Sequence, residues 1–154
     1  MPLFAGTDLE SHLRQFEGRW AGDFVLSSPQ TGNEERFPVE QSYWWDDGVL
    51  RGISVFERNG EMGSASSRSY VVGDRLVSEV EREGKIERYI GIRTESGVIW
   101  VPAATGRLTE HQVKESIVRE GAVRYLLTEG FDTYVVEGRA TQLIYRGKLL
   151  SVPE

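Results

Sequence analysis

Hydrophobic positions change their spacing at Gly18. Before this residue, Leu9, Leu13 and Phe16 recur at three- and four-residue intervals. This spacing predicts a helix over residues 7–17 with one apolar stripe. After Gly18, apolar and polar residues alternate, which is the pattern of strands with one buried face. The chain is therefore expected to begin with one helix and to continue as strands.

The predicted helix carries signals at both ends. Thr7 is a favourable N-cap, Glu10 follows three residues later as in a capping box, and Gly18 suits the position after the last turn. His12 falls on the polar side and is expected to face solvent. A helix of three turns is marginal by itself. We therefore expect it to dock on one open end of the strand structure.

Glycine-bearing turns divide the strand region. They recur about every 8–12 residues, and the segments between them are rich in Val, Ile, Tyr and Trp. Residues 102–109 form a wider gap, predicted as a loop at the mouth of the fold, and 131–150 is either one long bent strand or a hairpin turning near Gly138. The predicted turns lie at 46–48, 59–60, 73–74, 83–84, 96–97, 120–121 and 129–130.

Such regular short strands are typical of an antiparallel sandwich or barrel. A sandwich has edge strands, which are often protected by Pro or by inward-pointing charges. Pro is scarce within these strand segments, and nine or ten consecutive strands can close on themselves. We therefore predict an all-β fold: one domain over 1–154, built as an antiparallel up-and-down β-barrel of about 8–10 strands with a short N-terminal helix capping it.

A Gly-x-Trp-x-Gly sequence marks the change from helix to strand. Gly18 is predicted to turn the chain, Trp20 to fill the barrel floor and Gly22 to let the backbone bend. With the short helix before it and the strands after it, this motif resembles the lipocalin and wider calycin group. The overall layout is most similar to small bacterial lipocalin-like domains of unknown function.

The resemblance implies a cation stacked on the Trp20 ring. In the lipocalin group, an Arg of the last strand lies over this Trp, and the matching position is Arg146, with Arg139 as the alternative. Such a contact contributes about 0.5–2 kcal/mol. The chain is less similar to the haem-binding nitrobindins, whose haem ligand is a His near the C-terminal end, because its last His is His111. No haem or other cofactor is therefore expected.

Composition excludes several classes of site and partner. The chain has 154 residues, no Cys and a net charge of −6. It can form no disulfide or Cys-based metal site, and no metal site is predicted. The negative charge argues against nucleic-acid binding. No apolar run approaches the ~20 residues of a membrane span, and the first residues do not read as a secretory signal, so no membrane insertion and a cytoplasmic location are expected.

Aromatic residues are densest at 43–45. Tyr43 and Trp45 alternate in step with Phe37, Val39 and Gln41, so this face is predicted to line the interior. Because neighbouring residues of a strand point to opposite faces, Trp44 is then predicted to lie outside. There it is a lone surface side chain, is covered by a loop, or forms a homodimer contact.

Charged residues also fall on faces that look apolar. Arg88 shares its face with the isoleucines of 86–92, and His111 and Glu115 share theirs with the apolar residues of 111–117. An unpaired buried charge costs several kcal/mol, so these side chains must pair, bind a ligand or lie near a mouth. The alternatives are that a bulge turns these faces toward water, that Arg88 and Glu115 form an internal ion pair, and that His111 ends a strand in solvent.

Three functions are compatible with this pattern. The first is binding of a small, mostly apolar molecule with one polar end in the barrel lumen, as a carrier or sensor. The second is a small cyclase, isomerase or lyase that uses polar residues of the same lumen as acid–base groups. The third is a structural barrel that binds a partner protein through the face around Trp44. The predicted ligand-binding residues are Gln41, Tyr43, Trp45, Arg88, His111 and Glu115, and the structural ones are Gly18, Trp20 and Arg146.

Overall fold

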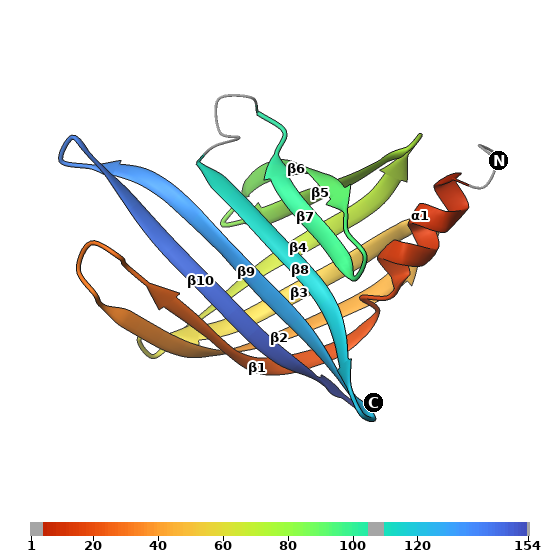
Figure 1. Ribbon diagram of the computed structural model, residues 1–154, viewed down its shortest axis with the longest axis horizontal. Helices are drawn as coiled ribbons and strands as arrows, with labels where there is room; N and C mark the ends of the chain where they lie inside the picture. The colour runs from red at the N-terminus through yellow and green to blue at the C-terminus, as the bar shows by residue number, and fades with distance from the viewer. Residues whose placement is uncertain (1–4, 105–109, 154) are drawn as a thin grey trace.

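The structure is a computed structural model that describes residues 5–104 and 110–153. Within these ranges the chain forms one helix followed by ten strands (Figure 1). The elements are α1 (Ala5–Arg14), β1 (Gly18–Ser27), β2 (Glu34–Asp46), β3 (Val49–Arg58), β4 (Glu61–Val72), β5 (Arg75–Arg82), β6 (Lys85–Arg93), β7 (Gly97–Pro102), β8 (His111–Glu120), β9 (Val123–Val136) and β10 (Arg139–Val152).

The strands form a closed antiparallel barrel, which confirms the predicted fold class. Each strand from β2 to β9 pairs with its neighbours in the chain, and β1 closes the ring by pairing with β10. This closing seam runs from Arg19 opposite Val152 to Ser27 opposite Ile144. Because the ring is closed, no strand of it is left with an unpaired edge, so edge protection by Pro or inward charges is not needed.

Several boundaries differ from the sequence prediction. The helix begins at Ala5 and ends at Arg14, so Thr7 lies inside its first turn and not at the N-cap. Gly130 lies within β9 and is not a turn residue, while the last segment is a hairpin that turns at Glu137 and Gly138. The predicted turn at 129–130 is wrong, because Gly130 instead provides space within β9 for the Tyr145 ring. Most of the predicted mouth loop, 105–109, lies outside the described residues.

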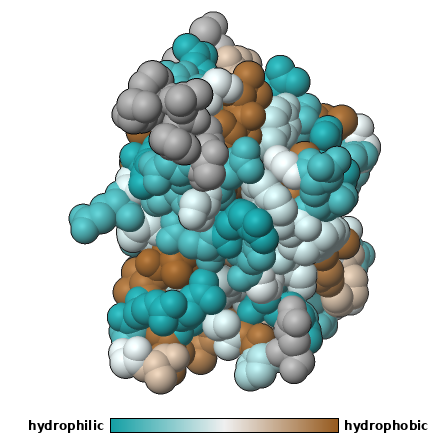
Figure 2. All heavy atoms as spheres, turned by 90° about the vertical axis from the view of Figure 1, so that its right-hand side faces the viewer, coloured by the Kyte–Doolittle hydropathy of each residue, from teal (hydrophilic) through white to brown (hydrophobic). Residues whose placement is uncertain are grey.

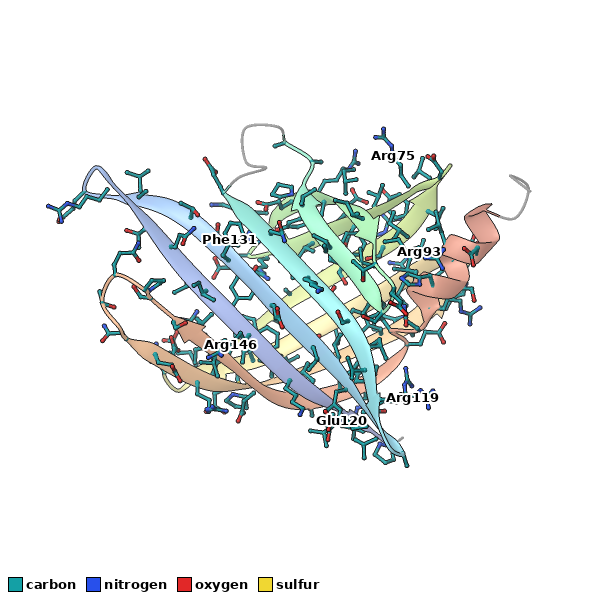
Figure 3. All side chains as sticks on the ribbon, viewed as in Figure 1. Arg75, Arg93, Arg119, Glu120, Phe131 and Arg146 are labelled. Atoms are coloured by element: carbon teal, nitrogen blue, oxygen red, sulfur yellow. The ribbon has the colours of Figure 1, made fainter. Side chains whose placement is uncertain are left out.

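The helix packs against one end of the barrel, which we call the closed end. His12 Nε2 hydrogen-bonds to the carbonyl oxygen of Gly97 at 2.8 Å, so His12 does not simply face solvent as predicted. On the outer side, Arg93 forms an ion pair with Asp8 beside the helix (Figure 3). Figure 2 looks at this end and shows hydrophilic side chains covering most of the surface, with hydrophobic atoms in separate patches. The closed end is therefore capped by a docked, water-facing helix.

Trp20 lies beneath the helix and is fully buried. Its Nε1 donates a hydrogen bond of 2.9 Å to the carbonyl oxygen of Phe16, which joins the barrel floor to the end of the helical segment. Around it packs a cluster of buried apolar side chains. These are Leu13, Phe16, Leu50, Leu76, Val98, Leu126 and Leu149. The prediction that Trp20 fills the floor is confirmed.

The cation over Trp20 is Arg124 of β9, so the prediction of Arg146 is wrong. The Arg124 Cζ lies 5.0 Å from the indole centroid, and its Nη2 donates a 2.8 Å hydrogen bond to the carbonyl oxygen of Gln15. Arg146 lies opposite Val25, well along β10 from the Trp20 level, and is exposed (Figure 3). The register of β10, which places Ser151 opposite Trp20, explains the difference.

Lumen-facing glycines lie directly opposite aromatic side chains. A Cβ atom built on Gly52 would lie 2.5 Å from the Tyr43 ring, and one on Gly130 would lie 2.7 Å from the Tyr145 ring. The rings therefore lie over the glycines along the wall, an arrangement that pairs an aromatic ring with a cross-strand glycine. The pairs are Phe24–Gly147, Tyr43–Gly52, Phe56–Gly63, Trp100–Gly91 and Tyr145–Gly130.

Over the described ranges, no helix has the length and apolar character needed to cross a membrane.

Candidate functional site

The barrel encloses a cavity of about 330 Å³, which we call the lumen. It lies between the packed closed end and the opposite end, the mouth. Arg58 and Arg82, the last residues of β3 and β5, both line it, so the lumen extends to the strand ends farthest from α1. Its size falls within the roughly 300–1,000 Å³ that is usual for small-molecule pockets.

One side of the lumen is apolar. Phe24 of β1, Phe37 of β2 and Phe56 of β3 form a row, with ring centroids 6.2 and 6.1 Å apart. We call this row the aromatic wall. Arg58 covers its mouth end: the Arg58 Cζ lies 5.2 Å from the Phe37 centroid, and its guanidinium group also pairs with Glu35. The aromatic wall can pack against the apolar body of a ligand.

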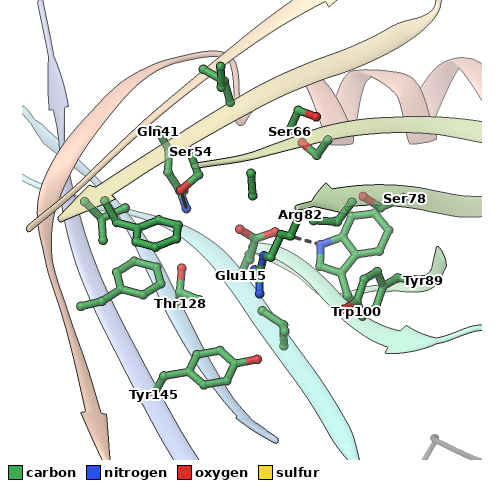
Figure 4. A pocket seen from close by; sticks show the side chains of 18 of the residues that line it. Gln41, Ser54, Ser66, Ser78, Arg82, Tyr89, Trp100, Glu115, Thr128 and Tyr145 are labelled. Carbon is green, nitrogen blue, oxygen red and sulfur yellow. Dashed lines mark hydrogen bonds between the residues drawn. The ribbon is translucent and has the colours of Figure 1, made fainter. Parts of the chain in front are cut away.

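The other side carries polar groups from several strands (Figure 4). Glu115 of β8 accepts a 2.9 Å hydrogen bond from Trp100 Nε1 of β7. Near them, Tyr43 donates a 3.2 Å hydrogen bond to Gln41, whose Nε2 lies 3.5 Å from the Ser54 hydroxyl. These side chains form two neighbouring hydrogen-bonded sets on the lumen face.

Burial changes the ionisation of two of these side chains. Removal from bulk water raises the pKa of the Glu115 carboxyl, and the hydrogen bond from Trp100 offsets only part of that rise. Burial, followed by the charge of Glu115, raises the pKa of the Tyr43 phenol well above its ordinary value. Protonation is therefore favoured at both groups, and Tyr43 remains a hydrogen-bond donor at neutral pH.

A second polar cluster lies nearer the mouth. His111 is buried, and its Nδ1 lies 3.6 Å from Asp132 Oδ1 across the β8–β9 pair. The His111 ring is flanked by Tyr89 and Tyr145, with ring centroids 5.5 and 6.3 Å away. The alternative that His111 ends a strand in solvent is therefore wrong, because its face of β8 points into the barrel.

Four of the six predicted lumen residues line the cavity. Gln41, Tyr43, His111 and Glu115 all border it, so β2 and β8 have the predicted orientation. Trp45 faces the packed core near the closed end, where Arg14 of the helix lies 5.0 Å from its ring centroid, and it does not line the lumen. Trp44 lies on the outside with 46% of its surface exposed, as predicted.

Arg88 points away from the lumen, and its prediction as a lumen residue is wrong. Its side chain is 59% exposed and pairs with Glu79 on the outer face. The register sets this orientation: Leu76 and Ser78 of β5 face inward and lie opposite Gly91 and Tyr89, so the even-numbered residues of β6 face outward. The isoleucines 86 and 92 are exposed accordingly, and the apolar pattern of this strand was misleading.

The sequence analysis missed Arg82, Asp132 and Tyr145, all of which line the lumen. Arg82 could have been found by extending the inward alternation of Leu76, Ser78 and Val80 to the end of β5. Tyr145 could have been found from its alternation with Leu143 and Leu149, which places all three on one face of β10.

In the part of the chain that the structure describes, no group of three or more His, Asp or Glu side chains is arranged to hold a metal ion. Comparisons with known proteins add no family assignment: no protein-family model matches the chain, and no curated protein matches it.

Proposed function

We propose that this barrel binds a small molecule with a mostly apolar body in its lumen. The observation that carries the proposal is the 330 Å³ cavity, which has an aromatic wall on one side and hydrogen-bonding groups on the other. A chain that used its barrel only as a scaffold would gain stability by filling this space, since each buried methylene contributes about 0.8 kcal/mol. The similarity of the Gly18–Gly22 motif to lipocalins favours the same function.

The test uses a neutral fluorescent probe, N-phenyl-1-naphthylamine, whose emission increases in apolar surroundings. We expect saturable binding at one site per chain. Ala65→Phe and Val80→Phe should weaken this binding at least tenfold, because both residues line the lumen. The matched controls are Ser64→Phe and Glu81→Phe, which place the same ring on the neighbouring, outward-facing position.

Thermal unfolding of all four variants shows whether each retains the fold. Equal binding by the lumen variants and their controls would contradict the proposal, as would absence of saturable binding in the unmodified protein. Native mass spectrometry of freshly purified protein provides an independent check, since a carrier is expected to retain part of its ligand.

Acid–base catalysis is a second candidate, and the raised pKa of Glu115 favours it. A carboxyl group whose pKa is raised can donate a proton to a carbonyl oxygen, while His111 in the same lumen can accept one. The expected activity is exchange of the acidic α-hydrogens of 2-tetralone in D₂O, followed by NMR. An exchange rate that equals the buffer rate, or that does not change in Glu115→Gln, would exclude this role.

A further inference from the structure

Arg82 carries a positive charge at the mouth end of the lumen, where its residue is exposed. It ends β5, lines the cavity and points its guanidinium group into it (Figure 4). Across the described residues, no side chain forms an ion pair or hydrogen bond with it. By contrast, Arg58, which also lines the lumen, pairs with Glu35. Arg82 therefore offers hydrogen-bond donors that the described part of the chain does not use.

The hydroxyl group of Tyr145 is a second unused donor on the other side of the lumen. It comes from β10 and points into the same cavity, and within the described ranges it forms no hydrogen bond (Figure 4). Burial is the main cause that raises the pKa of Tyr145, and Tyr89 and Asp132 raise it further, while the charge of Arg82 lowers it in part. Tyr145 therefore remains a donor over the ordinary pH range, and Arg82 is close enough to act on it electrostatically.

The acidic groups around them already interact with donors. Asp132 faces His111, Glu87 accepts a 2.6 Å hydrogen bond from Tyr89, and Glu115 accepts one from Trp100. None of these carboxyl groups lies within ion-pair distance of Arg82. Arg82 and Tyr145 both present donors, so the partner that suits them is an acceptor, and an anion is the acceptor that a guanidinium group binds best.

We propose that the lumen selects a small organic acid, with its carboxylate bound between Arg82 and Tyr145 and its apolar body against the aromatic wall. This inference rests on the proposed lumen-binding function. One guanidinium and one phenol suit the two oxygens of a carboxylate. A dianionic phosphate is disfavoured, because Arg82 alone compensates half its charge and the carboxyl group of Asp132 also lines the lumen.

The experiment compares two probes of nearly the same shape, 2-naphthoate and its uncharged amide, 2-naphthamide. Each displaces N-phenyl-1-naphthylamine, and the two dissociation constants are measured near pH 7.5. We expect 2-naphthoate to bind at least tenfold more tightly. Charge-assisted hydrogen bonds of this kind change affinity by roughly 10- to 100-fold.

Two variants remove the proposed donors. Arg82→Met keeps the length of the apolar stem, and Tyr145→Phe keeps the ring. Each variant should weaken the binding of 2-naphthoate, while the dissociation constant of 2-naphthamide should change by no more than about twofold. The matched control is Arg88→Met, which removes a cation from the outer face of the adjacent strand β6. It should change neither constant, which separates local binding at Arg82 from a general effect of net charge.

The outcomes are distinct. Equal affinity of the unmodified protein for the two probes, or equal weakening of both by Arg82→Met, overturns the carboxylate site and leaves lumen binding intact. If neither probe displaces N-phenyl-1-naphthylamine, the carboxylate site is also overturned, because Arg82 in a lumen of this size should bind 2-naphthoate. If N-phenyl-1-naphthylamine itself does not bind, the proposed function fails, and this inference fails with it.

Discussion

The two ends of this barrel use the same ten strands for opposite purposes. At the closed end, Trp20, Leu126 and Leu149 are fully buried and pack beneath the helix. Toward the mouth, the inward positions of the same strands carry Thr128, Tyr145 and other polar groups around an open cavity. The difference indicates that the closed end supplies stability and the mouth half supplies the binding surface.

This division predicts that core substitutions at the closed end change stability most. Trp20→Ala should lower the free energy of unfolding by about 3–5 kcal/mol, the range for truncating a buried Trp. Trp44→Ala, on the outer face, should change it by about 0.5 kcal/mol or less. Urea denaturation followed by circular dichroism measures both values. A loss below about 1 kcal/mol for Trp20→Ala would contradict its role at the floor.

A second prediction distinguishes the two arginines proposed for the Trp20 contact. Arg124→Met should lower the free energy of unfolding by about 1–3 kcal/mol, because it removes both the stacking on Trp20 and the hydrogen bond to the Gln15 carbonyl oxygen. Arg146→Met should leave the free energy of unfolding almost unchanged, because that side chain is exposed. The same urea titrations compare them. The reverse order of stability would restore Arg146 as the residue over Trp20.

The closed end was also the part that the sequence predicted best. Helix periodicity, the Gly18–Gly22 motif and the turn spacing depend on local residues, and these predicted the cap, the floor and the barrel. The prediction failed for Arg146 because register is a property of two paired strands, which one strand's sequence does not contain.

The lumen was predicted only in part, because a binding cavity breaks the rule that apolar residues face inward. In β6 the exposed isoleucines 86 and 92 look like core residues, while the lumen side carries Glu87 and Tyr89. In β8 the same rule worked, because Val113 and Ile117 face inward with Glu115. Alternation along a strand shows that its two faces differ, but it does not show which face points into the barrel. The orientation becomes clear only from how exposed each face is in the structure.

A third prediction concerns a substitution that fills part of the lumen, so that the mouth half becomes packed like the closed end. Gly52→Ala places a methyl group where the Tyr43 ring now lies, so the ring must turn into the lumen. The cost in unfolding free energy should be about 1 kcal/mol, at the low end for an added methyl group because the ring has empty space to enter. Probe affinity should fall more clearly than stability. Ser64→Thr, which adds a methyl group on the outer face, should change neither.

The smallest expected effect concerns pH. Because burial raises the pKa of Glu115 above about 4.5, the folded protein binds more protons than the unfolded chain between that value and the raised pKa. The unfolding free energy should therefore decrease as pH increases through this window. Glu115→Gln keeps an acceptor for Trp100 but cannot ionise, so its unfolding free energy should fall less as pH increases above about 4.5. Glu129→Gln, on the outer face of β9, is the control. Parallel pH curves for all three proteins would contradict the prediction.

The β1–β10 seam has a consequence for how the molecule assembles. Every other strand pair joins neighbours in the chain and can form as a hairpin with short loop closure, whereas the seam joins segments more than a hundred residues apart. Closing so long a loop has an entropic cost that hairpins avoid, so the seam should form late in folding. Arg124, by holding the Gln15 carbonyl oxygen from β9, ties the N-terminal segment across β10 and helps to keep this late-forming junction shut. Amide hydrogen exchange should therefore report its first opening at the seam, next to the aromatic wall.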